Sequence, residues 1–218
     1  MAYEARTFRL PELKGLSQKQ LEVHLGLYQG YVKFLNTLEE TLADMKRDAE
    51  KHAYALGEVA RRRGFEFGGM RMHEYYFGAM EERAEAPGVG SPLIQTLEKQ
   101  YGSFENWMTE FKATGMMRGI GWAVLYYDPA AMRFHNAWIA EHELGQLAGL
   151  PIILAMDMWE HAFMVDYVPT EKKNYIEAFF SNLNWNVLDE RFSVARESSF
   201  FQRKEPGTKE ARDEKLLS

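Results

Sequence analysis

Apolar residues recur at steps of three and four from Ser17 to about Arg63, the spacing that places them along one face of an α-helix. The apolar positions are Leu21, Leu25, Tyr28, Val32, Leu35, Leu38, Leu42 and Met45. Ser17 stands at the start of the pattern and is predicted to cap the first turn. Because the pattern is longer than an ordinary helix, we expect a break near Gly30 or Asn36 and therefore a long antiparallel helical hairpin.

Glycines interrupt the helical pattern in the next segment. They are Gly64, Gly68 and Gly69, after which a further helix is predicted from about Met70 to Glu85. Residues 86–92 contain two prolines and two glycines, a composition typical of a linker between domains. We therefore place an N-terminal helical hairpin domain in residues 1–88.

The remaining chain mixes helical and strand patterns. Residues 92–101 and 103–117 are predicted helices, the second capped by Ser103. Three short segments rich in aromatic and branched residues, 121–127, 132–139 and 152–156, are predicted strands. Residues 170–183 and 186–192 are predicted closing helices, and the charged residues 204–218 a disordered tail. The predicted fold class is α+β, with an α/β domain in residues 89–203 that holds a small three-stranded antiparallel sheet.

The composition narrows the possible chemistry. The chain has 218 residues, a net charge of −6 and no cysteine, so disulfides, thiolate metal sites and cysteine nucleophiles are excluded. The negative charge argues against nucleic acid as a partner. No stretch approaches the ~20 apolar residues that span a membrane, and the first ten residues do not resemble a secretory signal. We expect a cytoplasmic protein without a membrane partner.

The main candidate for chemistry is the segment Asp157 to His161, where a carboxylate and an imidazole stand four residues apart after an apolar stretch. Such oxygen and nitrogen donors suit a first-row transition metal. His24 and His73 lie in helix-patterned segments far upstream. Each residue has an ordinary explanation by itself, such as a core histidine or a turn cap. Together they predict a site of three histidines and one carboxylate, with room for a solvent molecule.

Several motifs support this prediction. They are a histidine followed by Tyr-Val and Leu-Asn in residues 24–36, a glycine pair before a histidine and aromatics in residues 68–77, the segment 157–162, and the supporting sequences 119–122 and 184–185. In order and spacing these motifs resemble the iron/manganese superoxide dismutases, over residues 8–203. The resemblance implies an enzyme that converts superoxide to oxygen and hydrogen peroxide. It also implies His24, His73, Asp157 and His161 as ligands of one manganese or iron ion per subunit.

The resemblance also implies roles for residues around the ion. Tyr31 matches a gateway tyrosine that borders the substrate channel and joins a proton relay, and Trp122 and Trp159 match an aromatic wall. Glu160 resembles a residue that reaches across a two-fold interface to His161 of the partner subunit, which implies a homodimer.

The residue that donates a hydrogen bond to the solvent molecule on the ion matches the family less directly. The iron-type members use a glutamine at the position where this chain has Gly69, which favours manganese. The other family position falls in the loop before the third strand, where we predict His142 as the donor, a residue that is compatible with iron. Gln146 is the alternative donor.

Four positions depart from the usual family pattern. Tyr28 replaces a histidine, Phe163 a tyrosine across the interface, Phe77 a tryptophan, and Lys172 an arginine of the funnel. Superoxide is an anion and the protein is acidic, so local cations are expected at the funnel mouth, with Lys172 and Lys173 as candidates.

The sequence disfavours two other functions and leaves a third open. A di-iron carboxylate protein is disfavoured because no histidine follows a glutamate by three residues. A zinc peptidase is disfavoured because His73-Glu74 and His142-Glu143 lack the second histidine of that motif. The serious alternative is a relative of the family that binds metal but has little turnover, because its funnel is altered.

Overall fold

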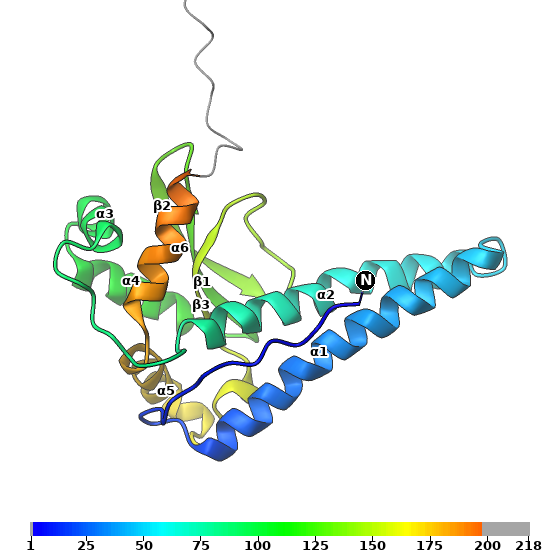
Figure 1. Ribbon diagram of the computed structural model, residues 1–218, viewed down its shortest axis with the longest axis horizontal. Coiled ribbons are helices and arrows are strands. Elements are labelled where there is room, and N and C mark those ends of the chain that lie inside the picture. Colours follow the sequence, from blue (N-terminus) through cyan, green and yellow to red (C-terminus); the bar gives the residue numbers. More distant parts are fainter. Residues whose placement is uncertain (1, 198–218) are drawn as a thin grey trace, which may run out of the picture.

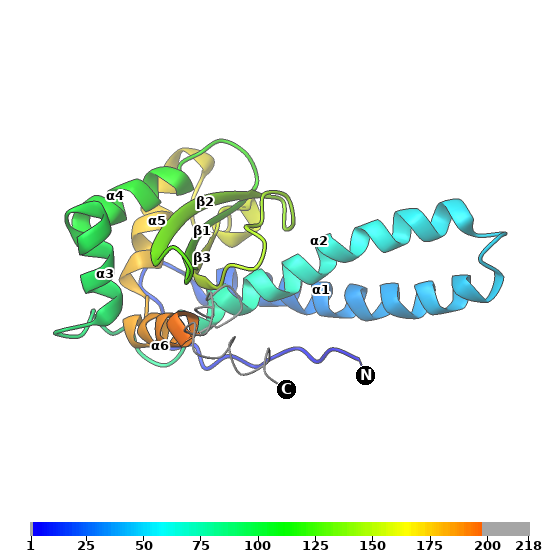
Figure 2. The same cartoon turned by 90° about the horizontal axis from the view of Figure 1, so that it is seen from above.

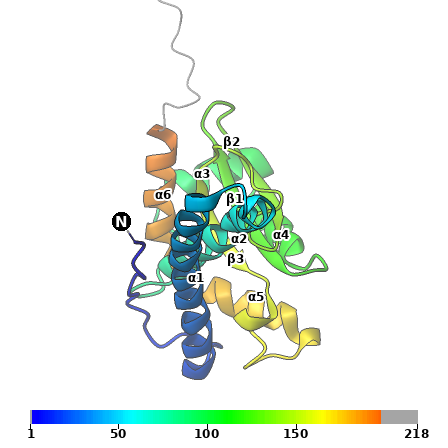
Figure 3. The ribbon, with the colours of Figure 1, turned by 90° about the vertical axis from the view of Figure 1, so that its right-hand side faces the viewer.

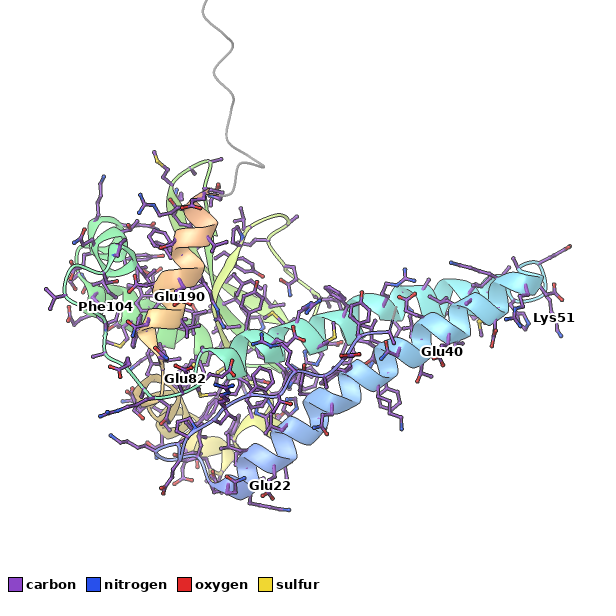
Figure 4. All side chains as sticks on the ribbon, in the orientation of Figure 1. Glu22, Glu40, Lys51, Glu82, Phe104 and Glu190 are labelled. Carbon is purple, nitrogen blue, oxygen red and sulfur yellow. The ribbon has the colours of Figure 1, made fainter. Side chains whose placement is uncertain are left out.

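The computed structural model describes residues 2–197, and the predicted tail, residues 204–218, lies outside them. Two long helices, α1 (Gln18–Met45) and α2 (Ala53–Gly78), form an antiparallel hairpin. The hairpin extends away from the other helices and the sheet (Figures 1 and 2). Lys51 marks its tip, and Glu22 and Glu40 lie along the exposed side of α1 (Figure 4). The predicted hairpin is confirmed.

The predicted position of the break between the two helices is wrong. Helix α1 continues through Gly30 and Asn36, and the chain reverses through a short 3₁₀ turn at Lys46–Asp48 and the polar residues up to His52. Asn36 does not break the helix because its side chain is engaged elsewhere: it accepts a hydrogen bond from the backbone N–H of Tyr3 at 2.8 Å and donates to the carbonyl oxygen of Tyr3 at 2.9 Å.

The three glycines of the second segment do not interrupt a helix either. Helix α2 runs through all of them, and the separate helix predicted from Met70 to Glu85 is the last part of α2, which ends at Gly78. A Cβ atom at Gly68 would lie 2.3 Å from the carbonyl oxygen of His142, and one at Gly69 would lie 2.5 Å from Cδ1 of Tyr31. These glycines therefore permit close packing inside a continuous helix.

The C-terminal part has the predicted α+β architecture. Strands β1 (Gly121–Asp128), β2 (Arg133–Ala140) and β3 (Ile152–Asp157) form an antiparallel sheet in the order β2-β1-β3. Each strand lies within one residue of its predicted bounds. Helices α3 (Pro92–Tyr101), α4 (Phe104–Gly115), α5 (Lys172–Ser181) and α6 (Trp185–Glu197) surround the sheet, with 3₁₀ turns at Glu160–Ala162 and Pro169–Glu171 (Figure 1). The division into domains at residues 88 and 89 stays a prediction.

Serine side chains begin three of the helices. Ser17, Ser91 and Ser103 accept hydrogen bonds from the backbone N–H groups of Gln20, Ile94 and Asn106. Each such cap stabilises a helix by about 1 kcal/mol. The predicted caps at Ser17 and Ser103 are confirmed.

The helical hairpin meets the sheet at the C-terminal end of strand β3. Strand β1 is almost wholly buried between β2 and β3, and helix α2 packs against β3 (Figure 3). Helix α1 contacts the 3₁₀ turn that follows β3. Both long helices, the end of β3 and this turn therefore meet at one place. Among residues 2–197, no helix combines the length and the apolar character needed to cross a membrane.

Candidate metal centre

Three histidine side chains converge on one carboxylate oxygen. Oδ2 of Asp157 lies 3.1 Å from Nε2 of His24, 3.2 Å from Nε2 of His161 and 3.5 Å from Nε2 of His73. The donor atoms of the four residues all lie within 4.8 Å of one another. His24, His73 and Asp157 are buried, and His161 is partly buried. The structure thus brings together all four predicted ligands, from segments far apart in the sequence.

Each of these side chains is positioned by local structure. His24 belongs to the buried stripe of α1. His73 lies one turn after Gly69 on α2, and its Nδ1 is 2.6 Å from the Gly69 carbonyl oxygen. Asp157 is the last residue of β3, where its Oδ1 accepts a hydrogen bond from the backbone N–H of Trp159 at 2.9 Å. This bond caps the turn that places His161 beside the carboxylate.

His73 provides the test of whether a cation fits. Its Nδ1 faces a carbonyl oxygen and therefore carries the proton in the neutral ring, which leaves a lone pair on Nε2. Nε2 is buried and has no hydrogen-bond partner among residues 2–197. It faces the Asp157 carboxylate, which also offers only lone pairs. A buried lone pair beside a carboxylate is costly unless a cation lies between them, so the donor set fits a metal ion.

The electrostatics of the cluster also suit a cation. Burial lowers the pKa of His24 and lowers the pKa of His73 further, so both imidazoles are neutral near neutral pH. Burial by itself would raise the pKa of Asp157, but the neighbouring His161 and His24 outweigh it and hold that pKa below its usual range. The carboxylate therefore stays ionised among neutral nitrogen donors.

His142 forms a hydrogen-bond chain with two predicted site residues. Its Nδ1 accepts from Nε1–H of Trp122 at 3.0 Å, so in the neutral ring Nε2 carries the proton. Nε2 lies 2.7 Å from the hydroxyl oxygen of Tyr31, to which it donates. Burial lowers the pKa of His142 to about 4, which keeps the ring neutral. Both ring nitrogens thus have protein partners.

Gln146, the alternative to His142, is engaged elsewhere. Its Oε1 accepts a hydrogen bond from the hydroxyl of Tyr126, and its Nε2 donates to the carbonyl oxygen of His142 at 3.1 Å. Gln146 therefore supports the loop that carries His142, and the chain from Trp122 to Tyr31 passes through the histidine ring.

Aromatic rings enclose the cluster. The Trp122 ring lies 5.1 Å from that of His73, and the Trp159 ring stacks on His142 at 4.7 Å and on His161 at 5.6 Å. Phe65, which the sequence reasoning missed, lies 4.6 Å from the His142 ring. These rings exclude water from the buried side of the cluster and restrict the motion of its histidines.

Two departures from the family pattern lie beside His24. The Phe77 ring is 4.8 Å from that of His24 and is fully buried. Tyr28 is also buried, and its hydroxyl donates to Oε1 of Glu74 at 3.1 Å and accepts from the backbone N–H of Arg6 at 2.8 Å. Tyr28 therefore fastens the N-terminal segment to α1 and α2.

The other two departures lie near the turn that carries His161. Phe163 is buried and stacks on Tyr175 with the ring centroids 5.1 Å apart. Lys172 donates from its ammonium group to the carbonyl oxygen of Met117 at 2.9 Å, and burial lowers its pKa although nearby Glu160 opposes this. Lys172 is thus a cation close to Glu160, whereas Lys173 is exposed.

Two residues that hold the cluster were missed in the sequence. Gln20 is buried, donates to the carbonyl oxygen of His161 at 2.6 Å and accepts from the backbone N–H of Val165 at 3.0 Å. The Tyr175 hydroxyl donates to the carbonyl oxygen of Asp157 at 2.6 Å. Gln20 could have been found, because it lies one turn before His24 on the same apolar face of α1.

Comparisons of the chain with known proteins find related sequences. The family model for iron/manganese superoxide dismutases, C-terminal domain, matches residues 89–191. A protein of Haloarcula marismortui named superoxide dismutase [Mn] is 36% identical over 171 residues, which cover 76% of this chain and 79% of the relative. One of Cupriavidus metallidurans named superoxide dismutase [Fe] is 33% identical over 187 residues, which cover 84% and 92%. A superoxide dismutase [Fe] of Aquifex pyrophilus is 34% identical, with coverages of 84% and 87%.

Proposed function

This chain belongs to the iron/manganese superoxide dismutase family, and on that premise we propose that it disproportionates superoxide to oxygen and hydrogen peroxide. The observation that carries the proposal is the buried cluster of His24, His73, Asp157 and His161, in which the His73 lone pair has no partner. We assign these four residues as ligands of one manganese or iron ion per subunit. Such an ion, when bound, supplies the one-electron chemistry by cycling between two oxidation states.

The hydrogen-bond chain supplies one of the two protons that the reaction consumes, and solvent supplies the other. Hydrogen peroxide forms only when two protons reach the reduced substrate, and the Tyr31 hydroxyl, which accepts from Nε2–H of His142, has its own proton free to donate towards the cluster. Burial raises the pKa of Tyr31, so the hydroxyl stays protonated. In this role Tyr31 borders the substrate, and His142 and Trp122 position it.

The ion itself is either manganese or iron. Position 69 holds glycine in place of the iron-type glutamine, and a Cβ there would lie 2.5 Å from the Tyr31 ring, so a larger side chain would require Tyr31 to shift. The relatives include proteins named for each metal, and histidine and carboxylate donors suit both.

The direct test is an assay of superoxide dismutation after the purified protein is loaded separately with manganese and with iron. We expect activity in at least one form, and we expect metal and activity to disappear together when a chelator removes the ion. A protein that binds stoichiometric metal but is inactive in both forms would instead be a metal-binding relative without turnover.

Replacing His142 with glutamine is expected to leave the metal bound but to shift its reduction potential. The glutamine amide can accept a hydrogen bond from Trp122 and donate one to Tyr31, as the imidazole does. Its second N–H is an additional hydrogen-bond donor beside the metal site, and such donors change the reduction potential of a bound ion. Metal content and a redox titration measure the two effects. An unchanged potential with full metal content would show that residue 142 does not lie within hydrogen-bonding reach of the ion's surroundings, which would contradict the prediction.

The assembly proposed from the family is a homodimer in which Glu160 contacts His161 of the other subunit. Glu160 is exposed in the single chain, and Met164, whose backbone N–H donates to the Glu160 carbonyl oxygen, and the following Val165 are exposed as well. Exposed apolar side chains beside an exposed glutamate suit a subunit interface. The mass of the protein in solution tests this assembly.

A further inference from the structure

A polar cavity of about 350 Å³ lies where the N-terminal segment crosses α2 and α6, apart from the metal ligands. It is lined by Arg6, Arg71, Glu74, Tyr75 and Arg191. Three of the five lining residues are cationic in a protein whose net charge is −6. The arginines come from three different segments of the chain, so only the tertiary fold gathers them.

Arg191 has no carboxylate partner of its own. Its guanidinium donates to the carbonyl oxygens of Ile153 and Tyr75, each at 3.1 Å, and lies 5.0 Å from the centre of the Tyr75 ring. No carboxylate among residues 2–197 lies within ion-pair distance of it. Burial lowers the pKa of Arg191 to about 10 and the positive charge of Arg6 acts in the same direction, whereas Tyr75 and Glu81 oppose them. Glu81 is thus the nearby carboxylate, but it forms no ion pair with Arg191.

The other two arginines add positive charge to the cavity. Arg71 pairs with Glu74 at 2.6 Å, and Glu74 also accepts a hydrogen bond from Tyr28, so each oxygen of this carboxylate already has a partner. The Arg6 side chain is 53% exposed, makes a long contact of 3.4 Å with Glu81 and lies 5.2 Å from the centre of the Phe8 ring. Three guanidinium groups thus line the cavity together with one carboxylate, Glu74, while Glu81 lies nearby outside the lining.

We propose that this cavity is a binding site for a small oxyanion of the phosphate class, held between Arg6, Arg71 and Arg191. Guanidinium groups bind phosphate through planar pairs of N–H donors, and an arginine has five such donors, of which Arg191 uses two on backbone carbonyls. The bound anion supplies Arg191 with a direct ion-pair partner and ties the N-terminal segment to α2 and α6. This site does not depend on the proposed dismutase function.

The test is calorimetric titration of the metal-loaded protein with inorganic phosphate at constant ionic strength. Arg6→Gln removes one lining charge at an exposed position and leaves intact the backbone N–H that Tyr28 binds. We expect it to weaken phosphate binding roughly tenfold or more, as loss of a charged hydrogen-bond donor does. Arg9→Gln is the matched control, because it removes the same charge from the same segment but does not line the cavity, and its affinity should change less than about twofold.

Thermal unfolding with and without phosphate provides a second readout. Phosphate should raise the Tm of the original protein and of Arg9→Gln, but not that of Arg6→Gln, because a ligand stabilises only the folded state that binds it. The proposal is overturned by undetectable binding at millimolar phosphate or by equal weakening of binding in the Arg6→Gln and Arg9→Gln variants. A Lys172→Gln variant tests the other candidate position, the cation close to Glu160. Binding that is lost in Lys172→Gln and retained in Arg6→Gln would also overturn the proposal, because the anion would then lie near Lys172. Tighter binding of succinate than of phosphate would overturn the phosphate class.

Discussion

Replacement of Asp157 with asparagine should yield a folded protein that has lost its bound metal and its dismutase activity. The carboxylate is fully buried, and Nε2 atoms of all three histidines lie within 3.5 Å of its Oδ2. Removing one partner of a buried charge pair costs about 3–5 kcal/mol, which corresponds to a loss of metal affinity of a hundredfold or more. Asparagine keeps an oxygen for the Trp159 N–H, so the turn survives. Metal content after dialysis and dismutase activity measure the effect.

Asp128→Asn is the matched control for this prediction. Asp128 also caps a turn, accepting from the backbone N–H groups of Ala130 and Ala131 at 2.9 Å and 3.1 Å. It is not among the clustered metal-binding groups. The same chemical change there should leave the metal content unaltered. Stoichiometric metal in Asp157→Asn, or equal loss in both variants, would refute the assigned ligand.

Replacement of Gly68 with alanine should destabilise the protein by about 1–3 kcal/mol, the usual cost of an overpacked core. The new Cβ would lie 2.3 Å from the carbonyl oxygen of His142 and 3.0 Å from the carbonyl carbon. Backbone atoms cannot move away as a flexible side chain can, so relief of the clash shifts His142 and weakens its bonds to Trp122 and Tyr31. Urea titration measures the free energy of unfolding.

Gly57→Ala lies in the same helix and is the control. No atom lies within 4 Å of a Cβ at that position, so alanine should gain about 0.5–1 kcal/mol from its better helix propensity. The two variants are therefore expected to change stability in opposite directions. Equal stabilisation of both would show that α2 and the His142 loop are not in close contact in solution.

Local patterns in the sequence predict the secondary structure correctly where contacts between residues close together in the chain stabilise it. The three- and four-residue spacing on α1 predicts its buried face, and Ser17 predicts its start. The strands were predicted within one residue because their apolar segments are bounded by turn residues. These features depend on side chains only a few positions apart, which a sequence displays directly.

Long-range contacts explain where the prediction of the fold was wrong. Gly68 and Gly69 look like helix breakers, yet α2 continues because His142 and Tyr31 pack where side chains would otherwise be. Asn36 looks like a break, yet its amide binds Tyr3. In each case the partner lies at least 33 residues away in the sequence, so no local pattern reveals it.

The candidate metal site likewise has features that the sequence predicts and features that depend on long-range contacts. The donor types of the metal cluster are evident in the sequence, and the spacing of the motifs indicates which three histidines and which aspartate to consider. The folded chain adds that Gln20 and Tyr175 hold the backbone around the cluster, that Tyr28 turns towards Glu74, and that three arginines share a cavity. Donor chemistry belongs to individual side chains, whereas the distance and burial that give them a common function arise when separate segments pack together.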